Sequence, residues 1–257
     1  MDTPVTQRIT IVLVGVVLAA CAIWSGQSAL GQPKKLVPAD KGGRIPEPKV
    51  GPSDHDCRSE FEVDKKNLAS TGTNPYFILE VGYRLHFEHK KEKLTITVLP
   101  ETKVVDGVET RVVEEREEVD GKLKEVSRNF FAIDKTTKDV YYFGEDVDNY
   151  KDGKIVNHSG GWLSGVGGAH FGLMMPGEIR VGDKFYNEHA PGKAMDRAEV
   201  VSKDEKVHTP AGRYEKCVHM KETTPLENDV SDKWYAPGVG LIKDDEMDLV
   251  RVEKSKG

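Results

Sequence analysis

A cluster of carboxylates begins at Glu145 in the segment EDVDNYKDG. Oxygen ligands at alternate loop positions are typical of calcium sites of the EF-hand type. Both possible registers fail: a loop starting at Asp148 has Tyr150 at position 3, and one starting at Asp146 has Lys151 in place of the required glycine. A looser metal site using Glu145, Asp146 and Asp148 stays open as an alternative. The favoured interpretation is a solvated acidic loop between strands.

The next segment, GWLSGVGGAHFG, is rich in glycine. It does not bind phosphate in the manner of G-x-G-x-x-G, because His170 stands at the last glycine position and Pro176 prevents a following helix. Ser164 lacks the G-x-S-x-G elbow that exposes a hydrolase nucleophile. The glycines are expected to let the backbone cross over packed side chains such as Trp162 and Phe171.

Histidine spacing gives no support for a metal or haem site. The eight histidines are scattered, and no His-x-x-x-His or Cys-x-x-Cys occurs. We therefore predict no metal, no cofactor and no enzymatic activity. A weaker alternative is a metal-binding protein or hydrolase that uses the 145–170 loop, with His158 and His170 joining the three carboxylates.

The chain has 257 residues, of which 37% are hydrophobic and 31% charged, with a formal net charge of −6. This composition is typical of one sizeable folded domain with extensions. Acidic and basic residues are interleaved, so the basic surface that nucleic acid requires is absent from the sequence pattern. Nucleic acid is excluded as a partner.

The first residues form an export signal. Residues 9–24 carry one polar side chain, Thr10, and follow Arg8, as in the apolar region of a signal peptide. Three fates are open: lipidation of Cys21 within LAAC, cleavage after Gly31, or retention as a membrane anchor. Each of these fates predicts that the folded part of the protein is exported to the bacterial periplasm or the cell-envelope surface. We assign residues 1–31 to this leader.

Residues 32–59 are rich in proline, glycine and charge, and are predicted to be a flexible tether. Beyond the leader, the cysteines are Cys57 and Cys217. In an oxidising compartment they could form a disulfide that closes a long loop. The alternative is two unlinked thiols, one of them buried.

Residues 60–257 are predicted to form a mainly β domain, an antiparallel curved sheet or partial barrel with few short helices. Asp106-Gly107, Asp120-Gly121 and Asp152-Gly153 are typical hairpin turns between segments rich in β-forming residues. The expected strands are residues 82–89, 93–99, 109–119, 122–133, 139–143, 154–157, 183–189, 195–203, 214–223, 230–236 and 239–252.

The hairpin from Arg111 to Lys124 differs from the others. Its centre, Glu114 to Glu118, is charged on both faces of a strand. It is therefore predicted to project into solvent beyond the core. This gives a rival functional hypothesis, a protein-interaction module beside a membrane complex.

Several segments together resemble an uncharacterised family of bacterial exported β-rich proteins and lipoproteins. They include NPYFILEVGYRLHFE, HTPAGRYEKC and KWYAPGVGLIKD, within residues 74–252. This family is similar in pattern to the curved-sheet lipoproteins of the cell envelope. The resemblance implies an envelope location and a β architecture, and it supplies no catalytic residue.

The leading hypothesis is a membrane-tethered, non-enzymatic domain that binds a hydrophobic ligand or an envelope protein. A concave apolar surface on the curved sheet is a natural ligand site. The alternative is that the candidate lining residues only fill the core. These candidates are Tyr141, Phe143, Trp162, Phe171, Met174 and Met175.

Overall fold

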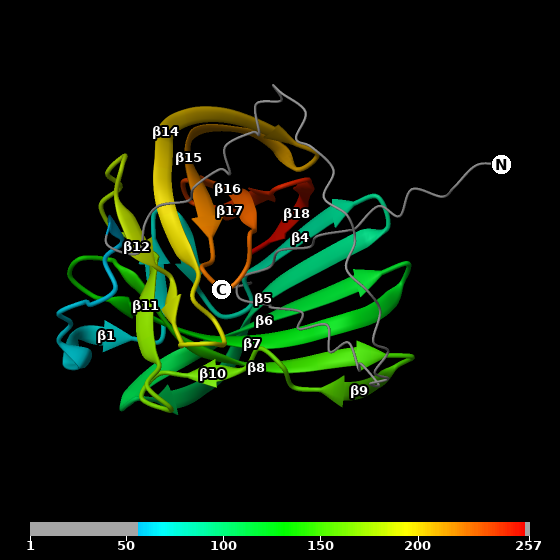
Figure 1. Ribbon diagram of the computed structural model, residues 1–257. Helices are drawn as coiled ribbons and strands as arrows, with labels where there is room; N and C mark the ends of the chain where they lie inside the picture. The colour runs from blue at the N-terminus through cyan, green and yellow to red at the C-terminus, as the bar shows by residue number, and fades with distance from the viewer. Residues whose placement is uncertain (1–55, 255–257) are drawn as a thin grey trace, which may run out of the picture.

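The structure, a computed structural model, describes residues 56–254 and consists mainly of strands joined by turns and loops (Figure 1). Its first half contains the 3-10 turn η2 (Lys65–Asn67) and the strands β1 (Leu68–Ala69), β2 (Gly72–Asn74), β3 (Phe77–Leu79), β4 (Arg84–His89), β5 (Glu92–Val105), β6 (Val108–Val119), β7 (Lys122–Asp134), β8 (Val140–Lys151) and β9 (Lys154–Asn157). Its second half contains β10 (Trp162–Leu163), β11 (His170–Met175), β12 (Lys184–Tyr186), β13 (Glu188–His189), β14 (Arg197–Thr209), β15 (Gly212–Thr223), β16 (Val230–Ala236), β17 (Gly240–Asp244) and β18 (Met247–Glu253).

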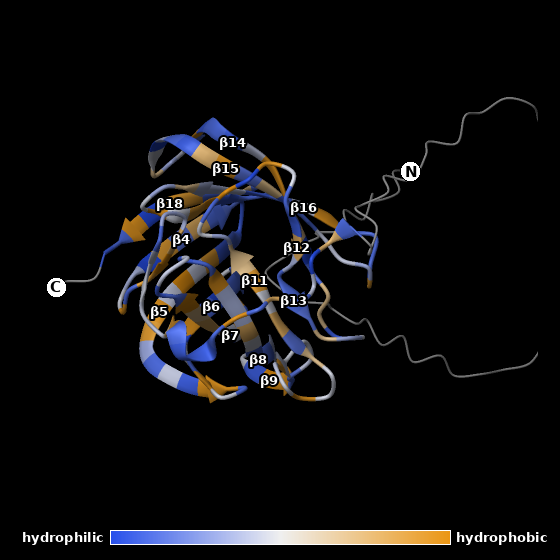
Figure 2. Ribbon diagram, turned by 90° about the vertical axis from the view of Figure 1, so that its left-hand side faces the viewer, coloured by the Kyte–Doolittle hydropathy of each residue, from blue (hydrophilic) through white to orange (hydrophobic). Residues whose placement is uncertain are grey.

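Within residues 56–254, sixteen strands form one antiparallel sheet, whose main path has the order β12-β14-β15-β16-β17-β18-β4-β5-β6-β7-β8-β11-β13, with β1 paired to β7 and with β9 and β10 paired to β8. The strands β2 and β3 form a separate hairpin. The two end strands of the main path, β12 and β13, are consecutive in the chain and separated by Asn187 alone. The sheet must therefore curl until its ends meet, and it is nearly closed. Figure 2 shows β14 and β15 on one side of the common interior and β8 and β9 on the other. The predicted antiparallel, curved β fold is confirmed.

Three predicted hairpin turns are also confirmed. Each Asp-Gly pair has two consecutive positive φ angles, for example 50° at Asp106 and 75° at Gly107. Such angles match the twist of the flanking strands, and Asp-Gly tolerates them better than most pairs. The turns connect β5 to β6, β6 to β7, and β8 to β9.

The prediction that the charged hairpin projects into solvent is wrong. Its strands, β6 and β7, lie in the middle of the sheet, with β5 on one side and β8 on the other. Glu115 and Arg111 are buried. Period-2 alternation sends Glu115 inward with Val113 while Glu114 and Arg116 point to the opposite face. A strand charged on both faces can thus be central when the interior of the sheet is itself polar.

The predicted disulfide between Cys57 and Cys217 is absent from the structure, and both thiols are buried. Arg58, the residue after Cys57, forms an isolated β-bridge with Phe185 on β12. Phe185 is paired with Ala198 of β14, whereas Cys217 is paired with Glu205 of the same strand. Seven residues of extended strand separate those two positions, roughly 20 Å. A disulfide needs Cα atoms within about 7 Å.

The leader and most of the tether, with Cys21, lie outside the described residues. The tether was predicted to extend to residue 59, but Cys57 is already buried and Arg58 already contacts β12. Within residues 56–254, no helix has the length and apolar character needed to cross a membrane.

Candidate functional site: an apolar cavity beside buried carboxylates

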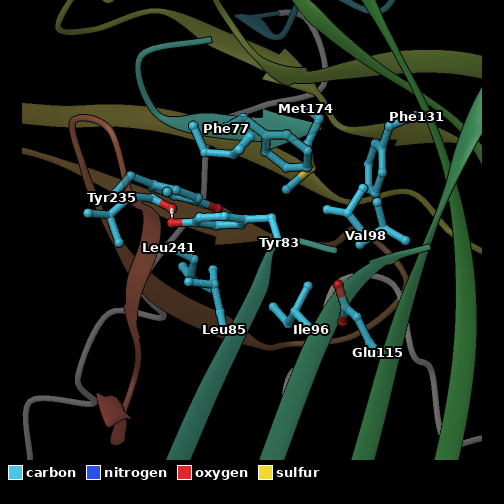
Figure 3. Close-up of a pocket in the computed structure, with 14 residues that line it drawn as sticks. Phe77, Tyr83, Leu85, Ile96, Val98, Glu115, Phe131, Met174, Tyr235 and Leu241 are labelled. Atoms are coloured by element: carbon cyan, nitrogen blue, oxygen red, sulfur yellow. Dashed lines mark hydrogen bonds between the residues drawn. The ribbon is translucent and has the colours of Figure 1, made fainter. Parts of the chain in front are cut away.

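An apolar cavity of about 60 Å³ lies inside the curled sheet (Figure 3). It is lined by aliphatic and aromatic side chains, with one acid among them. Its walls are Phe77, Ile78, Tyr83, Leu85, Ile96, Val98, Val113, Glu115, Phe131, Met174, Tyr235, Val239, Gly240 and Leu241.

Strand register places these side chains together. Leu85 on β4 is paired with Ile96 on β5, and Ile96 is in turn paired with Glu115 on β6. Directly opposed residues in an antiparallel sheet share a face. Val98 and Val113 form the next pair along the same two strands. Three adjacent strands thus present one continuous inner wall, apolar except at Glu115.

The far wall of the cavity is built by segments distant in the sequence. Phe77 comes from the short β2–β3 hairpin, and Tyr235 and Leu241 come from the hairpin of β16 and β17. The Tyr83 hydroxyl donates a hydrogen bond of 2.8 Å to the Val239 carbonyl oxygen, which ties β4 to that hairpin (Figure 3). This bond satisfies the Tyr83 hydroxyl, so Tyr83 presents mainly the carbon atoms of its ring to the cavity.

Glu115 is the acid in the cavity wall. It is 5% exposed, and its Oε2 atom has no hydrogen-bond partner among the described residues. Burial raises the pKa of Glu115 to about 8, although Lys233 acts in the opposite direction. An acid that is hard to ionise therefore faces an apolar space.

Further carboxylates continue from Glu115 along the interior. Glu117 lies two residues along the same strand, and its partner across β6 and β7 is Glu125. Burial, together with the charge of Glu125, raises the pKa of Glu117 to about 9. Burial raises the pKa of Glu125 to about 7. These neighbouring acids disfavour one another's ionised forms.

Glu145 and Glu188 form a second acidic group in the interior. Glu145 is 1% exposed and Glu188 is fully buried, and none of their four carboxylate oxygens has a hydrogen bond within the described residues. Burial and then the charge of Glu188 raise the pKa of Glu145 well above its ordinary range. Burial also raises the pKa of Glu188 well above its ordinary range, although Trp162 acts in the opposite direction. The indole nitrogen of Trp162 lacks hydrogen-bond geometry toward the carboxylate.

Gly144 positions Trp162 in this group. The short strand β10 pairs with β8 so that Trp162 lies opposite Glu145 and Leu163 lies opposite Gly144. At Gly144 φ is +132°, and a Cβ atom there would collide with the Trp162 carbonyl oxygen. The close approach of the two backbones therefore requires glycine.

The predicted lining residues lie mostly in the packed core. Met174 contacts the cavity. Tyr141, Phe143, Trp162 and Met175 are buried in the hydrophobic cluster, and Phe171 packs against that cluster. The structure therefore brings one of the six candidates to the cavity.

The three carboxylates considered for a metal do not converge. Glu145 points into the interior, whereas Asp146 forms an ion pair with Lys103 and Asp148 forms one with Arg128. His158 lies 2.9 Å from Asp148 on the same outer face. Within residues 56–254, no group of three or more His, Cys, Asp or Glu side chains is arranged to hold a metal ion.

The acids of the interior were missed in the sequence because the charged hairpin was assigned to solvent. The signal that identifies them is alternation. Val113, Glu115 and Glu117 occupy every second position of one strand, so an apolar inner wall at Val113 requires that both acids face inward.

No family model and no curated protein matched the chain. Among solved structures, the chain is similar to a "putative lipoprotein" from Parabacteroides distasonis, with 12% identity and a TM-score of 0.36. The match covers 71% of this chain and 100% of the other. Similarity at this level gives no information on function.

Proposed function

We propose that this protein is an exported, membrane-tethered, non-enzymatic binding protein that holds a small apolar ligand in the cavity of its curled sheet. The observation that carries the proposal is unfilled apolar volume in an otherwise packed interior. Protein cores are close-packed, and voids larger than a water molecule are few. Apolar cavities tend to stay dry and to accept apolar molecules.

The cavity walls favour a hydrocarbon ligand. Leu85, Ile96, Val98 and Leu241 present only carbon to the cavity, and all of them except the partly buried Ile96 are buried. Phe77 and Ile78 on β3 are half-buried and connect the cavity to the surface. A short alkyl chain can therefore lie inside and extend toward β3.

Tethering and export rest on the sequence of the leader. The apolar run of residues 9–24 and the LAAC segment support a lipid anchor at Cys21 or a membrane-inserted leader. A tether of roughly 25 residues would then hold the sheet away from the membrane surface. The intact mass of the natural protein distinguishes an acylated Cys21 from a chain cleaved after Gly31.

Binding is tested with n-hexanol, a small neutral ligand, by calorimetric titration of the natural exported protein. Val98→Phe fills the cavity, whereas Val104→Phe adds the same ring at a position of the same strand that is 71% exposed. We expect hexanol to bind the wild type and Val104→Phe, and to bind Val98→Phe at least about tenfold more weakly, since the pocket volume is lost. Equal affinity of the two variants, or no binding by a folded wild type, would show that the cavity is not a binding site.

A further inference from the structure

Acids outnumber bases in the interior around the cavity. Glu115, Glu125, Glu145 and Glu188 influence one another electrostatically from four different strands. Lys233 also acts on this group, but its ammonium nitrogen is held by Glu222 at 2.7 Å and by Asp244 at 3.7 Å. Lys233 is the charged group that acts most strongly on Glu115, but it is already paired with other acids, and Glu115 forms no ion pair of its own among the described residues.

A serine hydroxyl is a further unsatisfied polar group in the same interior. Ser231 is 1% exposed, and its hydroxyl oxygen has no hydrogen-bond partner among the described residues. It lies opposite Glu222 in the pairing of β15 and β16, and two residues from Lys233, so it faces the same interior. Buried hydroxyls in native proteins are usually satisfied by protein groups or by ordered water.

The chemistry of these groups favours an organic ammonium over a metal ion. Carboxylate and hydroxyl oxygens accept hydrogen bonds from an ammonium group, which needs no fixed coordination shell. The part of the chain that the structure describes has no cluster with metal-binding geometry. The rings of Tyr83 and Tyr235 in the cavity wall also suit a cation, because their faces are electron-rich.

We infer that the ligand of the cavity carries an ammonium group, which Glu115 binds at the inner wall while the alkyl part of the ligand occupies the apolar space. This inference rests on the proposed function and narrows its ligand to small alkylamines. In Figure 3 the Glu115 carboxylate lies beside Ile96 and Val98, within reach of a ligand in the cavity.

Proton release accompanies this binding. Four groups from other strands act on Glu115: Lys233 from β16, Asp244 from β17, Glu125 from β7 and Glu222 from β15. With a pKa of about 8, Glu115 is mostly protonated at pH 7 without ligand. An alkylamine, which ionises like lysine, arrives as the ammonium ion. Glu115 then loses its proton to the buffer, and the ammonium–carboxylate pair forms with no other bond made or broken.

The test compares n-hexylamine with n-hexanol at pH 7, in two buffers of different ionisation enthalpy. We expect hexylamine to bind the wild type at least about tenfold more tightly than hexanol, with release of up to about one proton per site. In Glu115→Gln the amine-to-alcohol affinity ratio should fall to about one. The matched control is Glu114→Gln, the neighbouring acid on the opposite face of β6, which should keep the wild-type ratio.

The outcomes separate the two proposals. If hexanol binds but hexylamine binds no more tightly, or if hexylamine binding releases no proton, the ammonium inference is wrong and the apolar cavity stands. If Glu115→Gln is folded and keeps the preference for the amine, the inference is also wrong. If neither ligand binds the folded wild type, both proposals fail. Proton release by the wild type tests the inference even if Glu115→Gln does not fold.

Discussion

The ammonium nitrogen of Lys233 on β16 lies 2.7 Å from a carboxylate oxygen of Glu222 on β15, and both side chains are almost completely buried. Asp244 on β17 approaches the same nitrogen at 3.7 Å. Burial lowers the pKa of Lys233, but Asp244 and Glu222 outweigh this and hold it above the ordinary range. Three adjacent strands are therefore joined inside the sheet by one charged lysine.

Lys233→Met should destabilise the protein by about 3–5 kcal/mol. Removing one partner of a buried ion pair leaves the other charges without compensation in a poorly solvated interior. The free energy of unfolding measured in urea checks this. Lys206→Met is the matched control, because its ion pair with Glu215 is on the surface, with both side chains more than two-thirds exposed. It should leave the urea midpoint unchanged, and an equal effect of the two substitutions would contradict the prediction.

Arg111→Met should destabilise the protein by about 3 kcal/mol. The buried guanidinium of Arg111 donates 2.8 Å and 2.7 Å hydrogen bonds to the carbonyl oxygens of Ser70 and Pro100. The Pro100 carbonyl lies at an irregularity in the pairing of β5 and β6, and losing a charged donor deprives both carbonyls of this hydrogen bond. Thermal unfolding measures the loss.

The control for Arg111 lies on the same strand. Arg116 is 45% exposed in its side chain and forms an ion pair with Glu118. Exposed pairs of this kind contribute about 0–1 kcal/mol. Arg116→Met should therefore lower the melting temperature much less than Arg111→Met. A similar decrease in both would show that Arg111 does not stabilise the irregular pairing of β5 and β6.

The course of the sheet could be predicted from local signals in the sequence. The Asp-Gly pairs at Asp106, Asp120 and Asp152 determine hairpin turns, because their backbone angles suit few other residue pairs. Alternation in residues 83–87 likewise identified the inner face of β4, with Tyr83, Leu85 and Phe87 all buried. Local geometry of this kind is encoded in neighbouring residues.

The site could not be predicted in the same way, because it depends on pairings between distant strands. The surroundings of Glu115 include the charges of Lys233 and Asp244, more than a hundred residues later in the chain. Polar residues are mostly exposed, and this rule assigned the acids of the hairpin to solvent. The predicted disulfide between Cys57 and Cys217 is wrong for a related reason, since the distance between the two residues depends on where β12 and β15 pair along β14.

Stability should fall as the pH rises from 6.5 to 8.5. Burial raises the pKa of Glu115 from 4.5 to about 8, so the folded state keeps a proton that the unfolded chain loses. Such a group contributes stability that is fully present below pH 4.5 and is lost as the pH rises through about 8. Glu117 and Asp244, with pKa values of about 9 and about 7, act in the same direction. Burial lowers the pKa of His86 and His189, but their effect lies below pH 6.5.

Urea unfolding across this range measures the effect. Each acid contributes up to about 1.4 kcal/mol per pH unit. We expect the wild type to lose at least about 2 kcal/mol, and Glu115→Gln to lose about 2 kcal/mol less than the wild type. Glu114→Gln on the outer face should follow the wild type. Constant or rising stability over this range would mean that the interior acids are ionised in the folded protein.

Gly144→Ala should destabilise the protein by about 3 kcal/mol, more than the same substitution of a glycine in an open hairpin turn. At Gly144 an added methyl group meets the backbone of Trp162, and φ is +132°, which L residues rarely adopt. Gly121→Ala is the matched control, because it has φ of +69° in an open turn with nothing near the added carbon. It should cost about 1 kcal/mol from backbone strain alone. The difference between the two urea midpoints therefore measures the close contact of β8 with β10. Equal midpoints would show that β10 can move away from Gly144, and that Trp162 is not fixed beside Glu145 and Glu188.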